Sequence, residues 1–486
     1  MLCNHFSFFD YSNKVNLLRE NSMKKKKSDR ALKYFGTDGF RGEFGRELLL
    51  QHAFLIGRFL GWYFGKRLGF SGRILIGRDT RESSPKLEKE LSSGITRSGA
   101  RAYLLGVCTT PATSYLTESG GFDAAVMITA SHNPYRDNGI KVLNFRGEKL
   151  DDDTTIALES YLDGDLGALE IAGEDLPEDT CGEAVDYRGG LADYERHLLS
   201  LAGSLSGLRI GLDCANGAAY EIAPRIFERL GAEVRTIGCS PDGLNINLGV
   251  GSTHIEALSA LVRDEGLDVG FAFDGDGDRC IAVDSSGEII DGDREMLILA
   301  RHLKSSAELA SDTLVTTVMS NKGLHSALAK EGIKCEITPV GDRFVYERMM
   351  AGGYTLGGEQ SGHIIIRKHA STGDGILTSL CLATLVNEEK KSLLELSADL
   401  TPFPQLTENI SVADKERIMA DRDLINLRLR IADEIGDDGR IILRKSGTEN
   451  LIRVMVEHKN PDKCKQYLDK IAELVREKNF IYERKD

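Results

Sequence analysis

Residues 269–283 read VGFAFDGDGDRCIAV, and this stretch decides how the chain is interpreted. Asp274, Asp276 and Asp278 stand at alternate positions between two apolar runs. Because side chains alternate between faces in an extended chain, the three carboxylates are predicted to point the same way. The intervening glycines let the backbone wrap closely around a bound group. Three hard oxygen ligands with positions left open predict one Mg²⁺ per chain.

An EF-hand loop also begins with aspartates at alternate positions, but this chain does not continue as one. Counted from Asp274, the loop would need glycine at the sixth position and glutamate at the twelfth. The chain has Arg279 and Ser285 there, and its flanks are strand-like instead of helical. The EF-hand is therefore excluded, and a solvated acidic turn without a metal is the remaining alternative.

A serine follows a second apolar run, at residues 124–128. Residues 129–134 read TASHNP, a pattern that predicts a strand delivering Ser131 to an exposed loop. Ser131 and His132 are predicted to point to opposite faces, which argues against a hydrolase pair. The nucleophile elbow G-x-S-x-G is also absent. Ser131 is therefore interpreted as a serine that carries a phosphoryl group and supplies a metal ligand.

Two more polar loops lie between apolar runs. Residues 357–363, GGEQSGH, offer hydrogen-bond donors and acceptors between glycines, which suits the hydroxyls of a sugar. Residues 444–449, RKSGTE, combine two cations, two hydroxyls and a glycine into a predicted phosphate nest. A polar turn and a basic hairpin turn are the respective alternatives, since each stretch alone is weakly specific.

The four loops, in this order and spacing, resemble the α-D-phosphohexomutase superfamily, and further stretches resemble its phosphoglucosamine mutase branch. These stretches are FGTDGFRG at 35–42, DCANGA at 213–218, PDGLNIN at 241–247, GSTH at 251–254, VMSN at 318–321 and VGDR at 340–343. The resemblance covers roughly residues 33–480, and so many ordered motifs do not agree by chance. One departure is Asn450, because the family usually has proline after Glu449.

The resemblance implies an intramolecular phosphotransferase that interconverts glucosamine 6-phosphate and glucosamine 1-phosphate through a phosphoserine and a bisphosphate intermediate. It places Ser131 as nucleophile and as a metal ligand beside Asp274, Asp276 and Asp278, with Mg²⁺ as cofactor. Glucosamine 1,6-bisphosphate or glucose 1,6-bisphosphate is the implied activator. The product would supply UDP-N-acetylglucosamine and peptidoglycan precursors.

The same resemblance assigns roles to residues around the nucleophile. Arg41 and Arg279 belong near the transferring phosphoryl group, and Lys141 and His363 are rival candidates for proton transfer. Glu359 and Ser361 match contacts to sugar hydroxyls. Contacts to the phosphate that does not react match Arg444, Ser446, Gly447 and Thr448.

Two other functions stay open at this point. A phosphomannomutase or phosphoglucomutase would use the same serine and aspartates, although that branch more often has methionine where this chain has Gln360. A silent sugar-phosphate sensor would not need the intact serine, metal and phosphate loops. Relative activity on glucosamine, glucose and mannose phosphates separates the mutases from one another.

Composition limits the partners. The 486 residues carry 61 basic and 75 acidic side chains, a net charge of −14, which argues against nucleic acid and anionic membranes. Nine dispersed cysteines without C-x-x-C pairs predict reduced thiols in a cytoplasmic protein. No run of 18 apolar residues predicts a membrane span. The expected partner is a phosphorylated hexosamine, and a homodimer is one expected assembly.

Alternating strand-like and helix-like segments predict an α/β fold with four domains around a central cleft. Three related α/β domains are expected, followed by a smaller C-terminal α+β domain. The expected segments are an N-terminal extension at 1–30, a phosphoserine domain at 31–184, a metal-binding domain at 185–286, a sugar-binding domain at 287–401 and a phosphate-binding domain at 402–486. The acidic stretch 173–183 is the predicted first boundary.

Overall fold

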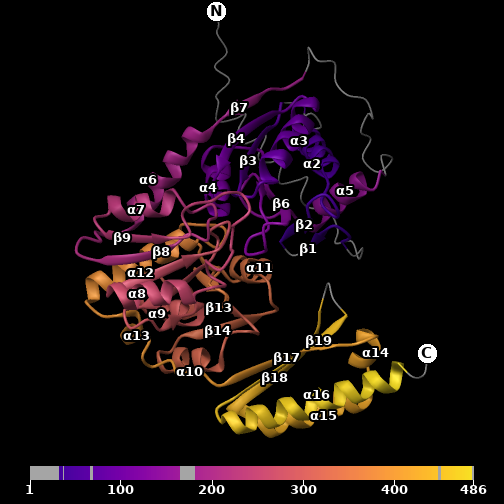
Figure 1. Cartoon of the computed structure of the whole chain (residues 1–486), viewed down its shortest axis with the longest axis vertical. Coiled ribbons are helices and arrows are strands. Elements are labelled where there is room, and N and C mark those ends of the chain that lie inside the picture. The colour runs from indigo at the N-terminus through magenta and orange to yellow at the C-terminus, as the bar shows by residue number, and fades with distance from the viewer. Residues whose placement is uncertain are drawn as a thin grey trace, which may run out of the picture. The chain divides into compact units, whose positions relative to one another are not determined.

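The computed structural model describes residues 32–36, 38–65, 69, 71–164, 181–446 and 450–483. They form two compact units, whose elements are labelled in Figure 1. The first unit holds the described residues up to Val318 together with Lys334–Ser397. The second holds Met319–Ile333 and the described residues from Ala398 onward. The predicted extension at 1–30 lies outside the described residues, as does most of the predicted boundary at 173–183.

The first unit begins with a seven-stranded sheet in the order β1-β2-β6-β5-β3-β4-β7. Its strands are β1 (Phe35–Gly36), β2 (Gly39–Glu43), β3 (Arg73–Arg78), β4 (Arg101–Val107), β5 (Ala124–Ile128), β6 (Asp137–Asn144) and β7 (Ala184–Asp186). Every residue of β5 is buried, as expected for a central strand that helices cover on both faces.

Helices cover this sheet on two sides. α2 (Leu50–Tyr63), α3 (Ser84–Arg97) and α5 (Asp152–Leu162) share one hydrophobic core with buried strand residues such as Ile74 and Val126. The connections β3–β4 and β4–β5 run in opposite directions, so right-handed crossovers place α4 (Thr110–Ser119) on the other face. α6 (Leu191–Leu201) packs beside α4, where the rings of Tyr115 and His197 stack.

A second sheet of the first unit has the order β12-β11-β10-β8-β9. Its elements are β8 (Arg209–Asp213), α7 (Ile222–Arg229), β9 (Glu233–Ile237), α8 (Glu256–Glu265), β10 (Val269–Phe273), β11 (Cys280–Asp284) and β12 (Ile289–Ile290). β12 pairs with β11, so this sheet continues past residue 286, where the sequence predicted the domain to end.

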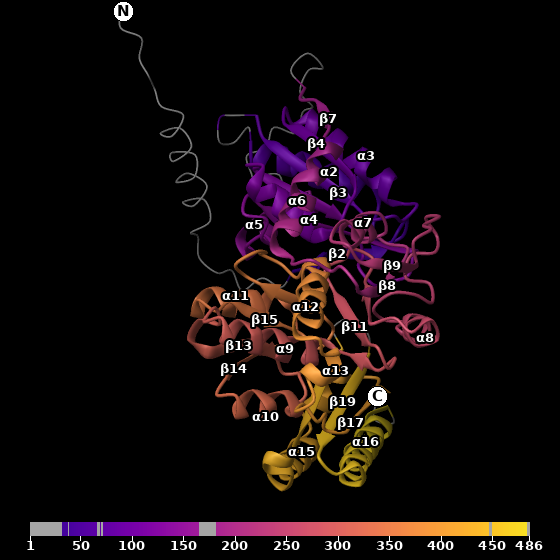
Figure 2. The same ribbon diagram turned by 90° about the vertical axis from the view of Figure 1, so that its left-hand side faces the viewer.

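A third sheet has the order β14-β13-β15-β16. Figure 2 labels three of its strands, β13, β14 and β15. Its elements are α9 (Gly292–Ser305), β13 (Thr313–Thr317), β14 (Lys334–Thr338), α11 (Asp342–Gly352), β15 (Leu356–Gly358), β16 (Ile364–Ile366), α12 (Gly375–Glu389) and α13 (Leu393–Leu396). Residues 319–333, between β13 and β14, group with the second unit.

The three sheets share one topology. Each contains a run of four strands, β3–β6, β8–β11 and β13–β16. The first strand of the run is flanked by the second and third, and the fourth pairs antiparallel with the third. The order therefore reverses at the first strand, and ligands of such sheets bind at the carboxyl ends near this point. The loops after the third strands β5, β10 and β15 carry Ser131, the aspartates and Glu359. The prediction of three related α/β domains is confirmed.

The second unit is smaller and contains one antiparallel sheet in the order β17-β19-β18. Its elements are α10 (Lys322–Lys330), β17 (Gln405–Ser411), α14 (Lys415–Met419), α15 (Arg422–Ile435), β18 (Gly439–Lys445), β19 (Leu451–His458) and α16 (Pro461–Glu483). Ile410, Val454 and Ile471 lie in its core. The apolar runs on either side of the predicted phosphate loop form β18 and β19, which pair antiparallel, and the α+β character predicted for this domain is confirmed.

Candidate active site

Ser131 lies in a tight turn just after the buried strand β5. Its backbone has a φ of 53°, a left-handed conformation that few residues other than glycine adopt. The side chain is 1% exposed, and Oγ donates a 2.5 Å hydrogen bond to Asp274 Oδ2. The prediction of an exposed loop hydroxyl was therefore wrong, because the aspartate loop covers the serine.

The prediction that Ser131 and His132 point apart was also wrong. Ser131 Oγ lies 3.4 Å from His132 Nδ1. The turn replaces the extended backbone on which the alternation of faces depends. Burial and the positive charges of Arg279 and Arg41 lower the pKa of His132 to about 4. The imidazole is therefore neutral near pH 7.

Two side chains from other segments clamp the backbone of this turn. Arg81 and Asn247 each donate 2.9 Å hydrogen bonds to the carbonyl oxygen of Ser131, and both also reach the carbonyl of Asn133. Arg81 is fully buried and pairs with the buried Asp79 at 2.8 Å. A buried guanidinium bonded to carbonyls is stable only in one arrangement, so these contacts fix the position of the serine.

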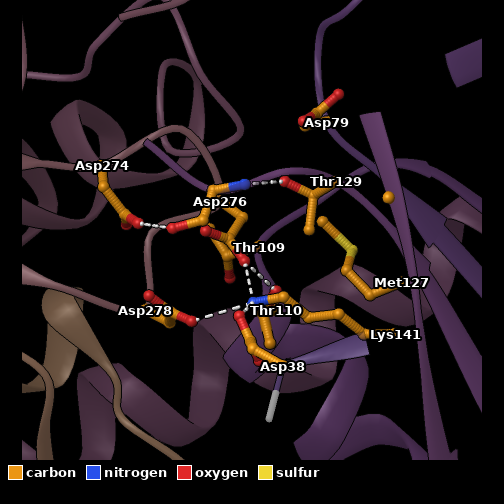
Figure 3. Close-up of polar contacts among 12 residues, drawn as sticks. Asp38, Asp79, Thr109, Thr110, Met127, Thr129, Lys141, Asp274, Asp276 and Asp278 are labelled. Carbon is orange, nitrogen blue, oxygen red and sulfur yellow. Dashed lines mark hydrogen bonds and ion pairs between the residues drawn. The ribbon is translucent and has the colours of Figure 1, made fainter. Parts of the chain in front are cut away.

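The aspartate loop is a turn and not an extended segment. Gly277 N donates to Asp274 O at 3.1 Å, and Gly277 has a φ of 70°. The carboxylates of Asp274, Asp276 and Asp278 nevertheless converge, with ligand atoms within 4.8 Å of one another, and all three residues are buried. Figure 3 shows them directed toward a common region. The predicted convergence is right, but the turn produces it and not strand alternation.

A cation fits this loop. Within the described residues, Asp276 Oδ1 and Asp278 Oδ1 are buried without a hydrogen-bond partner. Burial and the neighbouring charges of Asp278 and Asp276 raise the pKa of Asp274 well above its usual value. Three buried carboxylates with uncompensated oxygens are suitable ligands for a hard divalent ion.

Lys141 supplies positive charge on one side of the loop. Its Nζ lies 2.8 Å from Asp276 Oδ2, and 3.1 Å from both Asp278 Oδ2 and Asp38 Oδ2 (Figure 3). Burial disfavours the charged amine, but the carboxylates outweigh it and raise the pKa of Lys141 well above its usual value. In this arrangement Lys141 is an ammonium that neutralises carboxylates.

Two arginines flank the same region. Arg41 contacts Asp38 through Nη2, and its Nε is buried without a partner among the described residues. The backbone N–H of Arg279 donates to Asp274 Oδ1 at 3.2 Å. Arg279 Nε is 3.9 Å from Asp278 Oδ1 and makes no hydrogen bond in the described part of the chain. Donors of both guanidiniums therefore remain available to an anion.

Helix α4 also contacts the aspartate loop. Thr110, in its first turn, donates its N–H to Asp276 O at 2.9 Å and its hydroxyl to the Asp276 carboxylate. The N-terminus of a helix carries partial positive charge, which favours a nearby carboxylate. The loop of the second sheet is therefore held against an element of the first sheet.

The loop after β15 carries the predicted sugar contacts, Glu359 and Ser361. Gly341 N donates to Glu359 Oε1 at 3.0 Å, and Gln360 Nε2 donates to Asp291 Oδ2 at 3.1 Å. Ser361 is exposed. His363 is buried, and its Nε2 accepts a 3.3 Å hydrogen bond from Gly373 N. Cys280 N donates to Gly362 O, so this loop is bonded to the strand after the aspartates.

A cavity of about 280 Å³ opens within the first unit beside these groups. Asp38, Lys141, Asp278 and His363 line it, together with side chains from other elements. These include Thr110, Glu148, Lys149, Asp342, Arg343 and Tyr346. Lys149 bridges Asp38 at 2.8 Å and Asp342 at 2.5 Å, so it links the first and third sheets at the cavity wall.

The predicted phosphate loop lies in the second unit, and Gly447 and Thr448 fall outside the described residues. Arg444 on β18 is paired in register with Arg453 on β19. Burial and the charge of Arg453 lower the pKa of Arg444. Ser446 is buried, and its carbonyl accepts a 2.8 Å hydrogen bond from Lys415. Two like charges directly opposite each other repel, and an anion would relieve that repulsion.

Several residues of this site were not singled out from the sequence. Asp38, Asn247 and Asp342 lie inside motifs that carried the resemblance, but no single residue type marked their roles. Arg81 follows strand β3 in the segment DTR, which offered the same polar strand-end signal as the other loops. Lys149 and Arg453 gave no sequence signal, because their importance depends on cross-strand and cross-sheet contacts.

Comparison with known proteins places this site in a family. Four family models match in succession: phosphoglucomutase/phosphomannomutase alpha/beta/alpha domains I, II and III at residues 32–165, 192–287 and 291–403, and the C-terminal domain at 408–474. A phosphoglucosamine mutase of Lachnospira eligens is 48% identical over 450 residues, covering 92% of this chain and 99% of that protein. The chain belongs to the phosphoglucosamine mutase family.

Other relatives support the same family assignment. A phosphoglucosamine mutase of Streptococcus pneumoniae is 46% identical over 447 residues, covering 91% of this chain and 98% of that protein. A phosphoglucomutase/phosphomannomutase family protein of Burkholderia thailandensis has the same fold, with a TM-score of 0.76 and 24% identity over 92% of this chain and 98% of that chain. As a member of the phosphoglucosamine mutase family, the chain is a phosphohexomutase.

An Aspergillus fumigatus N-acetylphosphoglucosamine mutase, solved with GlcNAc-6P and magnesium, shares the fold at a TM-score of 0.62. It is 15% identical, and the match covers 96% of this chain and 99% of that chain.

Among the described residues of this chain, no helix has the length and apolar character needed to span a bilayer.

Proposed function

We propose that this protein interconverts glucosamine 6-phosphate and glucosamine 1-phosphate through phosphorylated Ser131. The observation that carries the proposal is the 2.5 Å hydrogen bond from Ser131 Oγ to Asp274, inside a buried loop of three carboxylates. A serine hydroxyl held at a metal-competent carboxylate cluster is arranged for phosphoryl transfer and not for acyl chemistry. Relatives at 46–48% identity carry the name phosphoglucosamine mutase.

The reaction consists of two phosphoryl transfers. First, the bond between phosphorus and Ser131 Oγ breaks as a sugar hydroxyl forms its own bond to phosphorus and gives up its proton. The product is a sugar bisphosphate and a free serine. The bisphosphate then turns, and its other phosphate returns to Ser131 Oγ, which loses its proton in turn. A sugar 1,6-bisphosphate added from outside phosphorylates the resting serine by the same step and therefore acts as activator.

Asp274, Asp276 and Asp278 would hold Mg²⁺, and the serine phosphate would face it. When bound, the ion supplies positive charge that stabilises phosphoryl oxygens. The protein's own residues do the rest. Lys141 neutralises Asp276 and Asp278, so fewer negative charges oppose an incoming phosphate. Arg41 and Arg279 have unpartnered Nε donors beside the nucleophile, in the described part of the chain, that can bind phosphoryl oxygens.

The clamp on Ser131 aligns the nucleophile. Arg81 and Asn247 hold its carbonyl, and Gly275 lies so close that a Cβ there would be 2.5 Å from the same oxygen. The serine and the aspartate loop are therefore fixed relative to each other before substrate arrives. Such positioning accounts for much of the acceleration of a phosphoryl transfer, because the transition state needs an in-line arrangement.

Proton transfer has two candidates, Lys141 and His363. Both line the cavity, so both can reach a sugar hydroxyl there. His363 Nδ1 is buried and makes no hydrogen bond among the described residues. The variants Lys141→Met and His363→Gln separate the roles: loss of the general base removes the acidic limb of the pH–rate profile, and loss of the general acid removes the alkaline limb. Loss of a positioning group lowers the whole profile. As an ammonium, Lys141 can serve only as the acid.

Substrate choice is assigned to the loop after β15. Glu359 is the anionic residue of that loop and would pair with the 2-ammonium group of glucosamine. Gln360 donates to Asp291, so its amide shapes the loop. Arg444, Ser446, Gly447 and Thr448 would hold the phosphate that does not react. A site that pairs a charged donor rejects an analogue without it, so glucosamine phosphate should be preferred by roughly tenfold, about 1.4 kcal/mol.

The test is the relative catalytic efficiency on the 6-phosphates of glucosamine, glucose and mannose, with Mg²⁺ and a bisphosphate activator present. The proposal expects the highest kcat/KM for glucosamine 6-phosphate, with weaker turnover of glucose 6-phosphate. Equal or better efficiency on glucose or mannose phosphates would make the protein a phosphoglucomutase or phosphomannomutase. Binding of all three without turnover would instead indicate a sugar-phosphate sensor.

A further inference from the structure

Two thiols meet at the carboxyl ends of two neighbouring parallel strands. Cys214 directly follows β8, and Cys239 lies two residues after β9. The N–H of Cys214 donates to Ile237 O at 3.1 Å, and Cys239 Sγ lies 3.5 Å from the same oxygen. Asp213 and Ile237, which precede the two cysteines, are register partners in this parallel strand pair, so Cys214 and Cys239 lie close together just beyond the strand ends. A local shift of the backbone is enough to join residues so placed by a disulfide.

The two thiols are not equivalent. Cys214 is fully buried, whereas Cys239 is partly exposed. The neighbouring Cys214 thiol lowers the pKa of Cys239, whereas the Cys239 thiol and burial raise the pKa of Cys214 well above its usual value. A partly exposed thiol beside a buried second thiol is the arrangement of an oxidant-sensitive pair.

The segment that carries Cys214 touches the catalytic machinery. Ala218 N donates to Gly275 O, inside the aspartate loop, at 2.8 Å. The carbonyl of Ala215 accepts a 2.8 Å hydrogen bond from the backbone of Asn247, whose side chain clamps Ser131. Packing here is tight, because a Cβ on Gly217 would lie 2.4 Å from Gly275 O.

The same segment has little freedom to absorb a shift. Ala215 and Asn216 both have left-handed backbones, with φ of 55° and 48°. Such conformations persist only where surrounding contacts enforce them. A disulfide needs a sulfur–sulfur distance of about 2.05 Å, well inside any non-bonded thiol contact, so forming it moves the backbone of at least one cysteine.

We propose that Cys214 and Cys239 form a peroxide-sensitive dithiol whose closure to a disulfide slows turnover by displacing residues 214–218 from the aspartate loop. Cys239 thiolate attacks one oxygen of hydrogen peroxide, the O–O bond breaks, and the hydroxide leaves as water after taking a proton. The sulfenic acid on Cys239 is then attacked by the Cys214 sulfur. A sulfur–sulfur bond forms, the sulfur–oxygen bond breaks, and a second water carries away the Cys214 proton.

The experiment exposes the folded, full-length protein to increasing hydrogen peroxide and follows two quantities. Peptide mapping measures the Cys214–Cys239 linkage, a readout that does not depend on the proposed function. Mutase activity is measured on the same samples before and after dithiothreitol. The expected result is that linkage and activity loss rise together, at least fivefold in kcat, and that the reductant reverses both.

Two variants and a control make the test specific. Cys239→Ser and Cys214→Ala should each start within about twofold of wild-type activity and resist peroxide, since neither can form the bond. Cys335→Ser is the matched control, because Cys335 is also a partly buried thiol on a parallel strand, and burial raises its pKa to about 12. It should remain as sensitive as wild type.

Three outcomes would overturn the proposal: no Cys214–Cys239 linkage in the folded protein, linkage without loss of activity, or equal peroxide sensitivity of Cys239→Ser. An inactive preparation that still forms the linkage would contradict the proposed function and leave the dithiol chemistry supported.

Discussion

Ser131 and Arg444 both lie at the ends of strands, next to polar segments, yet their surroundings are built differently. The Ser131 turn is buried, with its hydroxyl, its carbonyl and the facing carboxylates already bonded. Arg444 and Arg453 face each other across a strand pair as like charges, in a half-buried setting. Under the proposed function, the first region is organised before substrate arrives, whereas the second should gain stability when an anion binds.

The largest effect is expected from Ser131→Ala. Loss of the nucleophile should lower kcat on the order of a thousandfold or more and abolish phosphate incorporation. Because the hydroxyl is buried against Asp274, the variant should also lose about 1–2 kcal/mol of unfolding free energy. Steady-state kinetics and chemical denaturation measure both. Ser98→Ala, which removes a buried hydroxyl at the end of α3, should keep full activity. Wild-type turnover by Ser131→Ala would refute the mechanism.

The second largest effect is expected from loss of the metal or of one of its ligands. Asp276→Asn replaces one buried carboxylate, and activity should fall about a hundredfold. Chelation of divalent ions should silence the wild type, with recovery on adding Mg²⁺ and inhibition by millimolar Ca²⁺, which prefers a looser shell. Asp284→Asn is the control, since this buried aspartate lies at the end of β11 outside the triad. Full activity in chelator would mean that the aspartate loop works without a metal.

Variants of Asn247 and Arg81, which hold the backbone of Ser131, test whether the Ser131 turn is preorganised. Asn247→Ala removes two hydrogen bonds to the serine turn and should lower kcat about tenfold with KM nearly unchanged, because alignment is lost and binding is not. Arg81→Met should lower kcat further. It also leaves the buried Asp79 without its arginine partner, so the free energy of unfolding should fall by about 3–5 kcal/mol. Arg209→Met, another arginine bonded to carbonyls, is the control. A change in KM alone for Asn247→Ala would argue against positioning.

The smallest effects belong to the arginine pair. Arg444→Ala and Arg453→Ala should each lower kcat/KM about tenfold, roughly 1.4 kcal/mol, because binding energy at the remote phosphate orients the reacting one. Added bisphosphate should partly rescue both variants. Neutralising either arginine also removes a repulsion, so the unliganded protein should become slightly more stable. The exposed Arg428→Ala serves as control. Unchanged kinetics would place this strand pair away from substrate.

The sequence predicted much of this arrangement for a physical reason. Buried parallel strands read as apolar runs, and the polar residues after them mark the strand ends where ligands bind. The aspartate loop, Ser131 and the repeated α/β pattern were recognisable for that reason. What escaped prediction depends on folding at a distance: the burial of Ser131 by the second sheet, the clamp from Arg81 and Asn247, and the bridge from Lys149. A turn also replaces the extended backbone that was assumed at two places. At Ser131–His132 it makes the predicted orientation wrong, whereas at the aspartates the predicted convergence holds for a different reason.

The most direct test of the account is the phosphorylation state of Ser131. Dephosphorylated protein is incubated with glucosamine 1,6-bisphosphate and Mg²⁺, and intact mass and peptide mapping locate the phosphate. The account predicts one phosphate per chain, on Ser131, and this phosphorylated protein should then convert excess glucosamine 6-phosphate to glucosamine 1-phosphate without further bisphosphate. Protein that stays unphosphorylated, or that carries the phosphate on another residue while turning over, would contradict it.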